Sequence, residues 1–354
     1  MIKIAIFQAD LKVGGIQSSL YNLLMSNFFD DNYFIDVYLF SDEVFYDITH
    51  LKTNIHIHYL KPFPYVCRFI PFKLLKLFFR RNDVQLNNYD IVIDYDSYRP
   101  ECAYYCSKAN NSKKIMWVHN DMSLEYKYNK KYRILYYFFK NKYIYYDQFV
   151  AVSQGVVEPF MCRSKQTEKK IWIIPNIIDV ERIEKLCNEP LDIIIDEDAI
   201  NVVCVGKIYL AKGYDYLLKD FESAIKKNNL LRLYIVGDGP DKKKYENWVN
   251  KHNLSCIVTF LGNRVNPFNV MNKMDAFCLE SRYEGQGMVF WEAKALGLKI
   301  IFPKHLEKYN NNLIGSDNIV NDLVILQKKE KKRDTLIDYH KYIFSTLNSM
   351  FING

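Results

Sequence analysis

Short apolar runs, each followed by a glycine or polar junction and then by a helical pattern, recur along the whole chain. The runs are rich in β-branched and aromatic residues and are largely uninterrupted by polar ones. Continuous apolar strands that alternate with helices are typical of parallel sheets covered on both faces. The predicted strands are residues 2–7, 34–40, 89–94, 113–119, 147–153 and 170–176 in the first half, and residues 201–206, 231–237, 256–262, 275–280 and 298–303 in the second.

The two series of strands predict an α/β protein with two Rossmann-like, doubly wound domains. The length agrees, because 354 residues exceed what one hydrophobic core usually organises. Residues 177–200 are acidic, contain Pro190 and lack a clear sheet partner, so the linker is expected there. We therefore predict an N-terminal domain over 1–190, a C-terminal domain over 191–334, and a last helix within 335–354 that packs back on the N-terminal domain.

Composition narrows the class of protein further. A content of 49% hydrophobic and 25% charged residues is that of a globular chain. No run of eighteen apolar residues occurs, and the start "MIKIAIFQAD" lacks a basic leader followed by a long apolar stretch, so we expect a cytoplasmic protein without a spanning helix. The eight cysteines form no C-x-x-C pair, which favours reduced thiols and predicts no metal site.

The net charge of +7 is concentrated in two segments, residues 61–81 and 127–146. Each carries six Lys or Arg residues, no acid and many aromatic residues. This composition suits a peripheral membrane surface, with aromatic rings at headgroup level and cations on anionic phosphates, and we slightly favour that interpretation. The alternative is a pair of amphipathic domain helices with solvated lysines. No nucleic-acid-binding motif accompanies the charge, and the oligomeric state is left open.

Two features follow strands of the first half, where doubly wound domains bind ligands. Gly14 and Gly15 leave the backbone accessible, and a helix beginning near Gln17 would present its amides to an anionic group. A tight strand-to-helix turn explains the glycine pair equally well. His119 ends the fourth strand in "WVHND", where an imidazole can bind a sugar hydroxyl or accept its proton, although an isolated histidine is more often structural.

The second half places two lysines after its first strand. Lys207 stands at the strand end, and Lys212 directly precedes Gly213, which opens a helix. Two cations beside a helix N-terminus suit a diphosphate, although solvated surface lysines remain the alternative. After the next strand, Gly237 in "IVGDGP" would let a nucleobase approach the backbone.

The segment "SRYEGQGMVFWEAKALG", residues 281–297, joins a strand to a helix. Glu284 is predicted in the loop and Glu292 on the second helical turn, with unsatisfied amides of residues 286–289 between them. Carboxylates bind hydroxyls and free amides bind phosphate, so the order suits a sugar, a diphosphate and a ribose. The predicted ligand-binding residues of this segment are Glu284, Gly285, Gln286, Gly287, Met288 and Glu292.

Several segments, in this order, resemble the retaining glycosyltransferases of family 4, which have the two-domain GT-B fold with a crevice between the domains. The resemblance rests on "GGIQSSLYNL", "WVHND", "FVAVSQGVVEPF", "IIPNIID", "VGKIYLAKGYDYLLKDF", "LYIVGDGP" and the Glu-x7-Glu motif from Glu284 to Glu292. It covers most of the chain, and the Glu-x7-Glu motif is its most specific part.

The resemblance implies an enzyme that transfers a hexose-type sugar from a UDP-linked donor to a polysaccharide or lipid-linked glycan at the inner membrane surface. It implies that Glu284 contacts the donor sugar, that Glu292 holds the ribose, and that Lys207 and Lys212 neutralise the diphosphate. His119 lies where the family has a histidine near the reacting centre, so Glu284, His119 and Lys212 are the implied catalytic residues. The implied mechanism is front-face transfer with retention, and it needs no metal.

The sequence departs from the family pattern at four positions. Lys207 stands where arginine is usual and loses the bidentate fork. Gln286 replaces a usual phenylalanine beside the donor sugar, while Ile177 and Lys299 replace a glycine and a proline. Two other functions remain alternatives: a nucleotide-sugar epimerase of the same fold, and a non-catalytic, membrane-associated partner of a glycosyltransferase.

Overall fold

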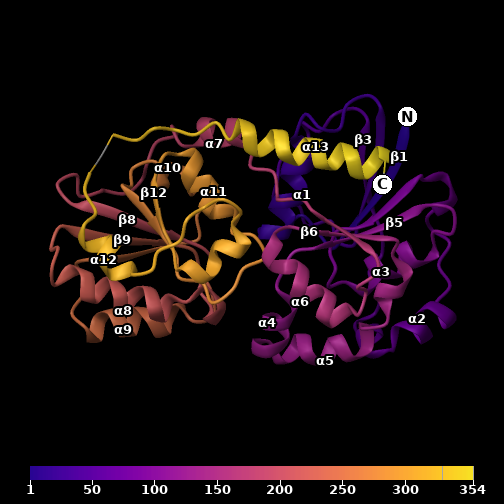
Figure 1. Cartoon of the computed structure of the whole chain (residues 1–354), viewed down its shortest axis with the longest axis horizontal. Coiled ribbons are helices and arrows are strands. Elements are labelled where there is room, and N and C mark those ends of the chain that lie inside the picture. Colours follow the sequence, from indigo (N-terminus) through magenta and orange to yellow (C-terminus); the bar gives the residue numbers. More distant parts are fainter. Residues whose placement is uncertain (329, 354) are drawn as a thin grey trace. The chain divides into compact units, whose positions relative to one another are not determined.

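The computed structural model describes residues 1–328 and 330–353 and divides the chain into two compact units. Unit 1 comprises Met1–Ile177 together with the C-terminal segment from Asp338, and unit 2 comprises Ile178–Ile337. Each unit is a parallel sheet with helices on both faces (Figure 1). The structure therefore confirms the predicted fold class.

Unit 1 contains a seven-stranded parallel sheet in the order β3-β2-β1-β4-β5-β6-β7. The direction of strand order reverses between β1 and β4, and such a reversal opens a crevice at the carboxyl ends of the two strands. The strands are β1 (Ile2–Gln8), β2 (Tyr33–Leu39), β3 (Ile55–Tyr59), β4 (Ile91–Asp94), β5 (Lys113–Val118), β6 (Gln148–Ala151) and β7 (Lys170–Ile173). The helices are α1 (Gly15–Met25), α2 (Phe72–Phe78), α3 (Pro100–Lys108), α4 (Met122–Tyr128), α5 (Lys130–Phe139), α6 (Gln154–Ser164) and α13 (Ile337–Asn353), with the 3-10 helices η1 (Tyr65–Phe69), η2 (Leu86–Asn88) and η3 (Lys142–Tyr145).

Unit 2 contains a five-stranded parallel sheet in the order β10-β9-β8-β11-β12, and its strand order reverses between β8 and β11. The strands are β8 (Ile200–Val205), β9 (Leu231–Val236), β10 (Val258–Gly262), β11 (Ala276–Cys278) and β12 (Lys299–Ile301). The helices are α7 (Val180–Leu186), α8 (Tyr214–Ile225), α9 (Lys242–Lys251), α10 (Phe268–Met271), α11 (Met288–Ala295) and α12 (Ile319–Val324), with the 3-10 helices η4 (Leu210–Lys212) and η5 (Lys304–Tyr309).

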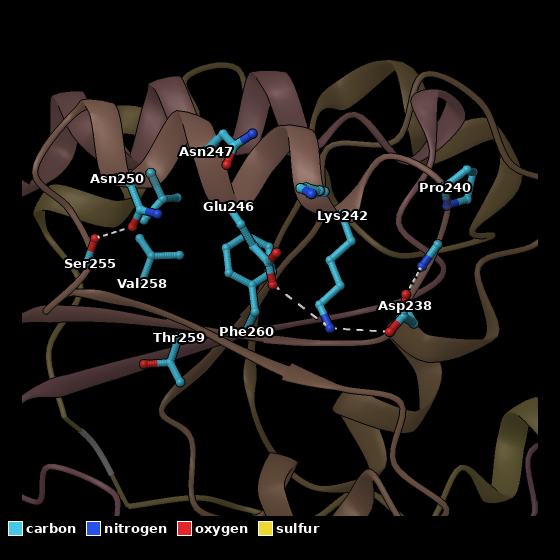
Figure 2. A pocket seen from close by; sticks show the side chains of 13 residues that line it. Asp238, Pro240, Lys242, Glu246, Asn247, Asn250, Ser255, Val258, Thr259 and Phe260 are labelled. Carbon is cyan, nitrogen blue, oxygen red and sulfur yellow. Dashed lines mark hydrogen bonds and ion pairs between the residues drawn. The ribbon is translucent and has the colours of Figure 1, made fainter.

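A groove of about 730 Å³ lies beside the edge strand β10, under helix α9 (Figure 2). Its wall is mixed polar and apolar, and Lys242 lies on it with ion pairs to Asp238 at 3.3 Å and to Glu246 at 3.9 Å. Phe260 and Val258 contribute apolar surface from the strand. None of the predicted site residues lines this groove, so it is separate from the predicted donor site.

The predicted strands are all present, and one further strand, β3, lies at the edge of the sheet in unit 1. Its sequence, "IHIHY", alternates isoleucine with histidine, and only Ile55 is fully buried. A half-exposed edge strand needs no continuous apolar run, which explains why the search for such runs missed it.

The two basic segments are not single helices, contrary to the amphipathic-helix alternative. Residues 61–81 form η1 and then α2, separated at Pro71, which has no amide hydrogen to continue a helix. Residues 127–146 span the end of α4, all of α5 and η3. Asn129 separates the first two, and its side chain caps α5 by accepting from the Tyr132 amide at 3.0 Å.

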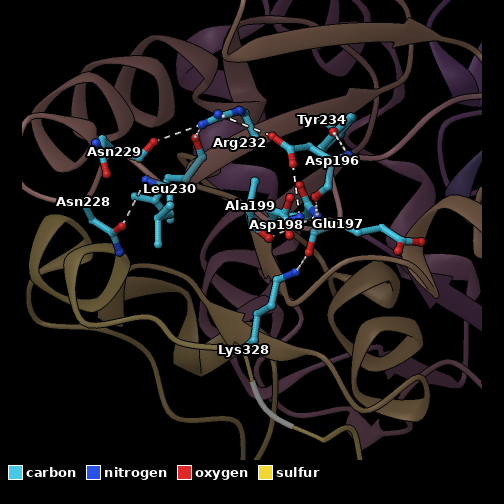
Figure 3. A network of polar contacts seen from close by, with 12 residues as sticks. Asp196, Glu197, Asp198, Ala199, Asn228, Asn229, Leu230, Arg232, Tyr234 and Lys328 are labelled. Carbon is cyan, nitrogen blue, oxygen red and sulfur yellow. Dashed lines mark hydrogen bonds and ion pairs between the residues drawn. The ribbon is translucent and has the colours of Figure 1, made fainter.

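The boundary between the units lies at residues 177 and 178, ahead of the position 190 expected from the sequence. Helix α7 packs on α10 and α11, so the first part of the expected linker is folded into unit 2. Residues 196–199 are also bound to unit 2, by hydrogen bonds and an ion pair (Figure 3). Asp196 pairs with Arg232 at 3.4 Å and accepts at its carbonyl from Asn201, and Lys328 donates to the Glu197 carbonyl.

The final helix, α13, packs on unit 1. Phe344 and Phe351 each place their rings 5.8 Å from that of Phe28. The Tyr339 hydroxyl donates to the Asn176 carbonyl at 2.6 Å. Helix α13 thus contributes to the core of the unit from which the chain departs at Ile177. Among the described residues, no helix combines the length and the apolarity that crossing a bilayer requires.

Candidate functional site

Lys212 and Glu284 form the centre of the candidate site in unit 2. The Lys212 ammonium lies 2.6 Å from Oε1 and 2.9 Å from Oε2 of Glu284, and the two side chains are only 18% and 8% exposed. Ser281 adds a hydrogen bond from its hydroxyl to Oε1 at 2.5 Å. Burial lowers the pKa of Lys212, but Glu284 and, after it, Tyr209 and Cys204 together outweigh that effect, so the pKa is raised and the ammonium stays charged.

Gly213 allows the two segments that carry these residues to meet. Its φ of +65° lies in the left-handed region, and a Cβ there would stand 1.8 Å from the Glu280 carbonyl oxygen. The Arg282 amide donates to the Ala211 carbonyl at 2.7 Å, and the Arg282 guanidinium forms a two-pronged ion pair with Asp215 at 2.7 and 2.9 Å. The loop after β11 is therefore held against the start of helix α8.

Two residues of the region after β12 complete this loop and were not predicted. The ring of His305 is hydrogen-bonded through Nε2 to the Ser281 carbonyl at 3.0 Å, and the Asn310 side chain accepts from the Gly287 amide at 3.2 Å. The Met288 amide bonds to the Gln286 carbonyl at 3.0 Å. The expectation of unsatisfied amides between the two glutamates is thus wrong for Gly287 and Met288, because the fold itself provides acceptors for them.

Glu292 lies on helix α11, as predicted, but in a different environment from Glu284. It is partly exposed, and loss of solvation raises its pKa to about 7, against the opposing charge of Arg182 on α7. The carboxyl group is therefore divided between its neutral and ionised forms near neutral pH. Both forms can accept a hydrogen bond from a hydroxyl group.

Gly237 is required by packing between loops. A Cβ at this position would stand 2.1 Å from the Gly206 carbonyl oxygen, and Gly239 meets the Ile208 carbonyl in the same way. The side of the Gly237 Cα on which a Cβ would stand is therefore filled by the loop after β8. Lys207, in that loop, is exposed.

The remaining candidates, Gly14, Gly15 and His119, belong to unit 1 and lie beyond the ends of β1 and β5. A Cβ on Gly15 would meet nothing within 4 Å, so the backbone there is open, whereas one on Gly14 would meet the Gln17 side chain at 2.3 Å. Helix α1 begins at Gly15, close to the expected start. The glycine pair therefore combines a tight turn with one accessible position.

His119 is a buried, neutral histidine. Its Nε2 lies 2.9 Å from the Tyr95 carbonyl and it is 6% exposed. Burial lowers its pKa to about 3, against the hydrogen bond to Tyr95. Because a carbonyl can only accept, Nε2 carries the hydrogen and Nδ1 is the acceptor nitrogen.

An unpredicted polar cluster follows β1 and β4 in unit 1. Asp10 accepts from Gln17 Nε2 at 2.9 Å and lies 3.9 Å from Arg99, while Asp96 accepts from the Tyr98 amide at 3.2 Å. Asp10 and Asp96 are both more than nine-tenths buried. The two acids directly after strand ends were the signal in the sequence that could have indicated them.

Comparisons with known proteins bear on the fold and on the class of protein. Residues 190–306 match the family model described as glycosyl transferases group 1. The whole chain superimposes on HepE of Anabaena, solved in complex with UDP and glucose, with a TM-score of 0.66, 17% identity, and coverage of 100% of this chain and 95% of that one. The fold is therefore GT-B, and the residues that match the group 1 model lie within unit 2.

Two curated relatives are similar over part of their length. An uncharacterized glycosyltransferase of Methanocaldococcus jannaschii is 30% identical over 54% of this chain and 48% of its own. An N-acetylgalactosaminyltransferase of Campylobacter jejuni, named for an undecaprenol diphosphate-linked saccharide acceptor, is 28% identical over 45% of this chain and 42% of its own. This chain thus spans about half or less of the length of these two curated relatives.

Proposed function

We propose that this chain is a retaining glycosyltransferase of family 4 that moves a hexose-type sugar from a UDP-linked donor to a polysaccharide or lipid-linked glycan. The observation that carries the proposal is the buried set of Lys212, Glu284 and Ser281 at the start of helix α8. A group 1 domain in unit 2 and a UDP-bound structural neighbour support the choice of donor.

In this proposal the donor diphosphate binds beside helix α8. Lys212 is charged and its position is fixed by Glu284, while the exposed Lys207 is able to move toward a ligand. Cations placed where negative charge develops stabilise the departing diphosphate, which is the largest expected catalytic contribution. These two lysines, rather than a metal ion, would neutralise that charge.

The other site residues then orient the sugar and the ribose. Glu284 accepts from a hydroxyl of the donor sugar, and Glu292 accepts from the ribose. His119 cannot act as a cationic acid near neutral pH, but its Nδ1 can accept from a sugar hydroxyl. The bond from the sugar to the diphosphate breaks on the face where the acceptor oxygen bonds, and the leaving diphosphate takes the acceptor proton.

The acceptor is expected at a membrane surface, because the two basic segments meet in one aromatic surface of unit 1. Phe69 of η1 and Phe138 of α5 lie 5.9 Å apart, edge to face. Leu77 and Phe78 of α2 and Tyr137 of α5 are 65%, 75% and 68% exposed. We define this basic aromatic surface as η1, α2 and α5.

Exposed cations lie on the same elements. Lys73 of α2 and Lys130, Lys131 and Arg133 of α5 are all exposed. Such an accumulation of cations next to exposed aromatic rings suits anionic lipid headgroups. We therefore propose peripheral binding to the cytoplasmic membrane face.

The test is transfer by the purified full chain, with UDP-sugars offered one at a time in the presence of lipid-linked acceptors. Transfer with retention is expected for one donor, and it should be lost in Lys212→Ala and in Glu284→Ala. Lys226→Ala, which removes a 70% exposed lysine after α8, is the control and should transfer normally. Unchanged turnover in both site variants would contradict the proposal.

Two further measurements test the alternative functions. If the chain is a nucleotide-sugar epimerase, incubation with the donor and no acceptor would convert the sugar without releasing it from the nucleotide. If it is a non-catalytic partner of a glycosyltransferase, it would bind vesicles but no UDP-sugar.

A further inference from the structure

A pair of carboxyl groups, those of Glu280 and Asp220, lies next to the loop after strand β11. We call this loop, which carries Glu284, the donor loop. Glu280 follows strand β11 and is 5% exposed, and its side chain is hydrogen-bonded to that of Asp220 on helix α8. Two carboxyl groups can share a hydrogen bond only if one of them carries a proton, because ionised carboxylates only accept. Glu280 Oε1 is buried and accepts no hydrogen bond from a donor group among the described residues, so a protonated carboxyl group is the form that burial favours there.

The electrostatic surroundings favour the neutral form of Glu280. Asp215 and Asp220 face it from α8, and Asp322 of α12 reaches the same cluster at Cys278. Lys212 and Glu284 act on Cys204, as Glu280 does, so they lie near the same cluster. The charge of Lys212 is already paired with Glu284. Burial, followed by the charge of Asp220, raises the pKa of Glu280 to about 8.

The backbone next to Glu280 contacts both segments of the donor site, the one that carries Lys212 and the one that carries Glu284. Its carbonyl oxygen rests on the Cα of Gly213, the neighbour of Lys212. Its next residue, Ser281, donates to Glu284 and accepts from His305. A shift of the Glu280 side chain away from α8 would therefore move the loop that carries Glu284 relative to the lysine that Glu284 holds.

We propose that Glu280 is a positioning residue whose neutral carboxyl group, by donating a hydrogen bond to Asp220, fixes the donor loop against helix α8. The inference rests on the proposed donor site but adds a residue that does not touch the donor. Ionisation of Glu280 places two carboxylates against each other in a buried position, and their repulsion loosens the loop. Donor affinity therefore falls on the alkaline side of neutrality.

The first experiment measures UDP affinity by calorimetry, with the full chain, at about pH 6.5 and about pH 9. Over this range the wild-type affinity should weaken at least about threefold more than that of Glu280→Gln, whose amide donates to Asp220 without titrating. Glu246→Gln, in the groove beside β10, is the matched control and should behave as the wild type does. Glu292 titrates in all of these proteins, so the comparison between variants cancels its effect.

The second experiment needs no ligand and measures the urea midpoint of unfolding over the same pH range. The pKa of Glu280 is raised above its unfolded value, so stability is lost as pH rises through about 8, and Glu280→Gln should not show that loss. Asp220→Asn is the second variant, in which removal of the neighbouring charge should weaken the alkaline loss.

The two experiments separate failure of this inference from failure of the proposed function. Absence of UDP binding at every pH would count against the proposed donor, while the stability series would still test the carboxyl pair. Equal pH dependence of stability in the wild type, Glu280→Gln and Asp220→Asn would overturn the inference. So would an equal loss of UDP affinity in the wild type and Glu280→Gln.

Discussion

The ammonium of Lys212 lies within 2.9 Å of both carboxylate oxygens of Glu284, and this contact joins the start of helix α8 to the loop after strand β11. The two residues are 72 positions apart in the chain. They follow β8 and β11, the neighbouring strands between which the strand order of unit 2 reverses. The pair is therefore both a structural link in unit 2 and the group of charges expected to receive the donor.

Removing one partner of this pair should destabilise unit 2. Lys212→Met leaves the Glu284 carboxylate buried without its cation, at an expected cost of about 3 kcal/mol in the free energy of unfolding. Glu284→Gln should recover part of this loss in the double variant Lys212→Met/Glu284→Gln, because no unpaired charge remains. Urea denaturation of the two single variants and the double variant measures the coupling. Additive effects would show that the two side chains are not coupled in solution.

Gly213→Ala should be strongly unfavourable, by about 2 kcal/mol or more, because the new Cβ would collide with the Glu280 carbonyl and φ is positive. Gly15→Ala is the matched control. It adds a methyl group at the first residue of helix α1, where a Cβ meets nothing within 4 Å. Thermal denaturation should show a lower midpoint for the first variant only. Equal midpoints would mean that the loop after β11 does not pack on Gly213 as described.

His119 should make the protein sensitive to acid. Its folded pKa of about 3 lies below the unfolded value of 6.5, so the unfolded chain takes up a proton that the folded chain does not, and stability is lost as pH falls below 6.5. At about pH 5 the loss should be about 2 kcal/mol relative to neutral pH. His119→Gln keeps an amide donor for the Tyr95 carbonyl and should lose less stability on acidification. The same slope of stability against pH in both proteins would exclude a buried neutral imidazole.

The basic aromatic surface should bind anionic vesicles. Substitution of both Leu77 and Phe78 by serine removes two exposed apolar side chains of α2 and should weaken binding to vesicles containing phosphatidylglycerol by about tenfold. Added salt should weaken the binding of the wild type as well. Ile194→Ser is the control, because this isoleucine is 96% exposed but lies in unit 2. Co-sedimentation that is unaffected by the double substitution would place membrane binding elsewhere.

The arrangement of strands was the part of the fold that the sequence predicted best. Buried parallel strands are continuous apolar runs, and each predicted run is a strand in the structure. The positions of Lys212 and Glu284 after strand ends followed from the same pattern, whereas the neighbouring positions of β8 and β11 in the sheet did not. Strand β3 does not fit this pattern because histidines alternate with its isoleucines. The alternative that each basic segment is one amphipathic helix is wrong, because Pro71 and Asn129 interrupt the two segments.

The partners of the site residues could not be predicted in the same way. His305 and Asn310 reach the donor loop only because the chain after β12 turns back through η5. The requirement for glycine at Gly237 depends on a neighbouring loop, because the Gly206 carbonyl lies where a Cβ would stand. Such contacts join segments distant in sequence and leave no local periodicity or composition from which to infer them.

The return of helix α13 to unit 1 has a consequence for how the chain folds during synthesis. Unit 2 is inserted, in sequence, between the two parts of unit 1. When the ribosome has made unit 1 up to Ile177, Phe28 and its neighbours still lack the rings of Phe344 and Phe351 that cover them. Unit 2 is contiguous and can complete its own core first, so the first unit to emerge is the last to be finished, and its exposed apolar face is a natural binding site for chaperones in the interval.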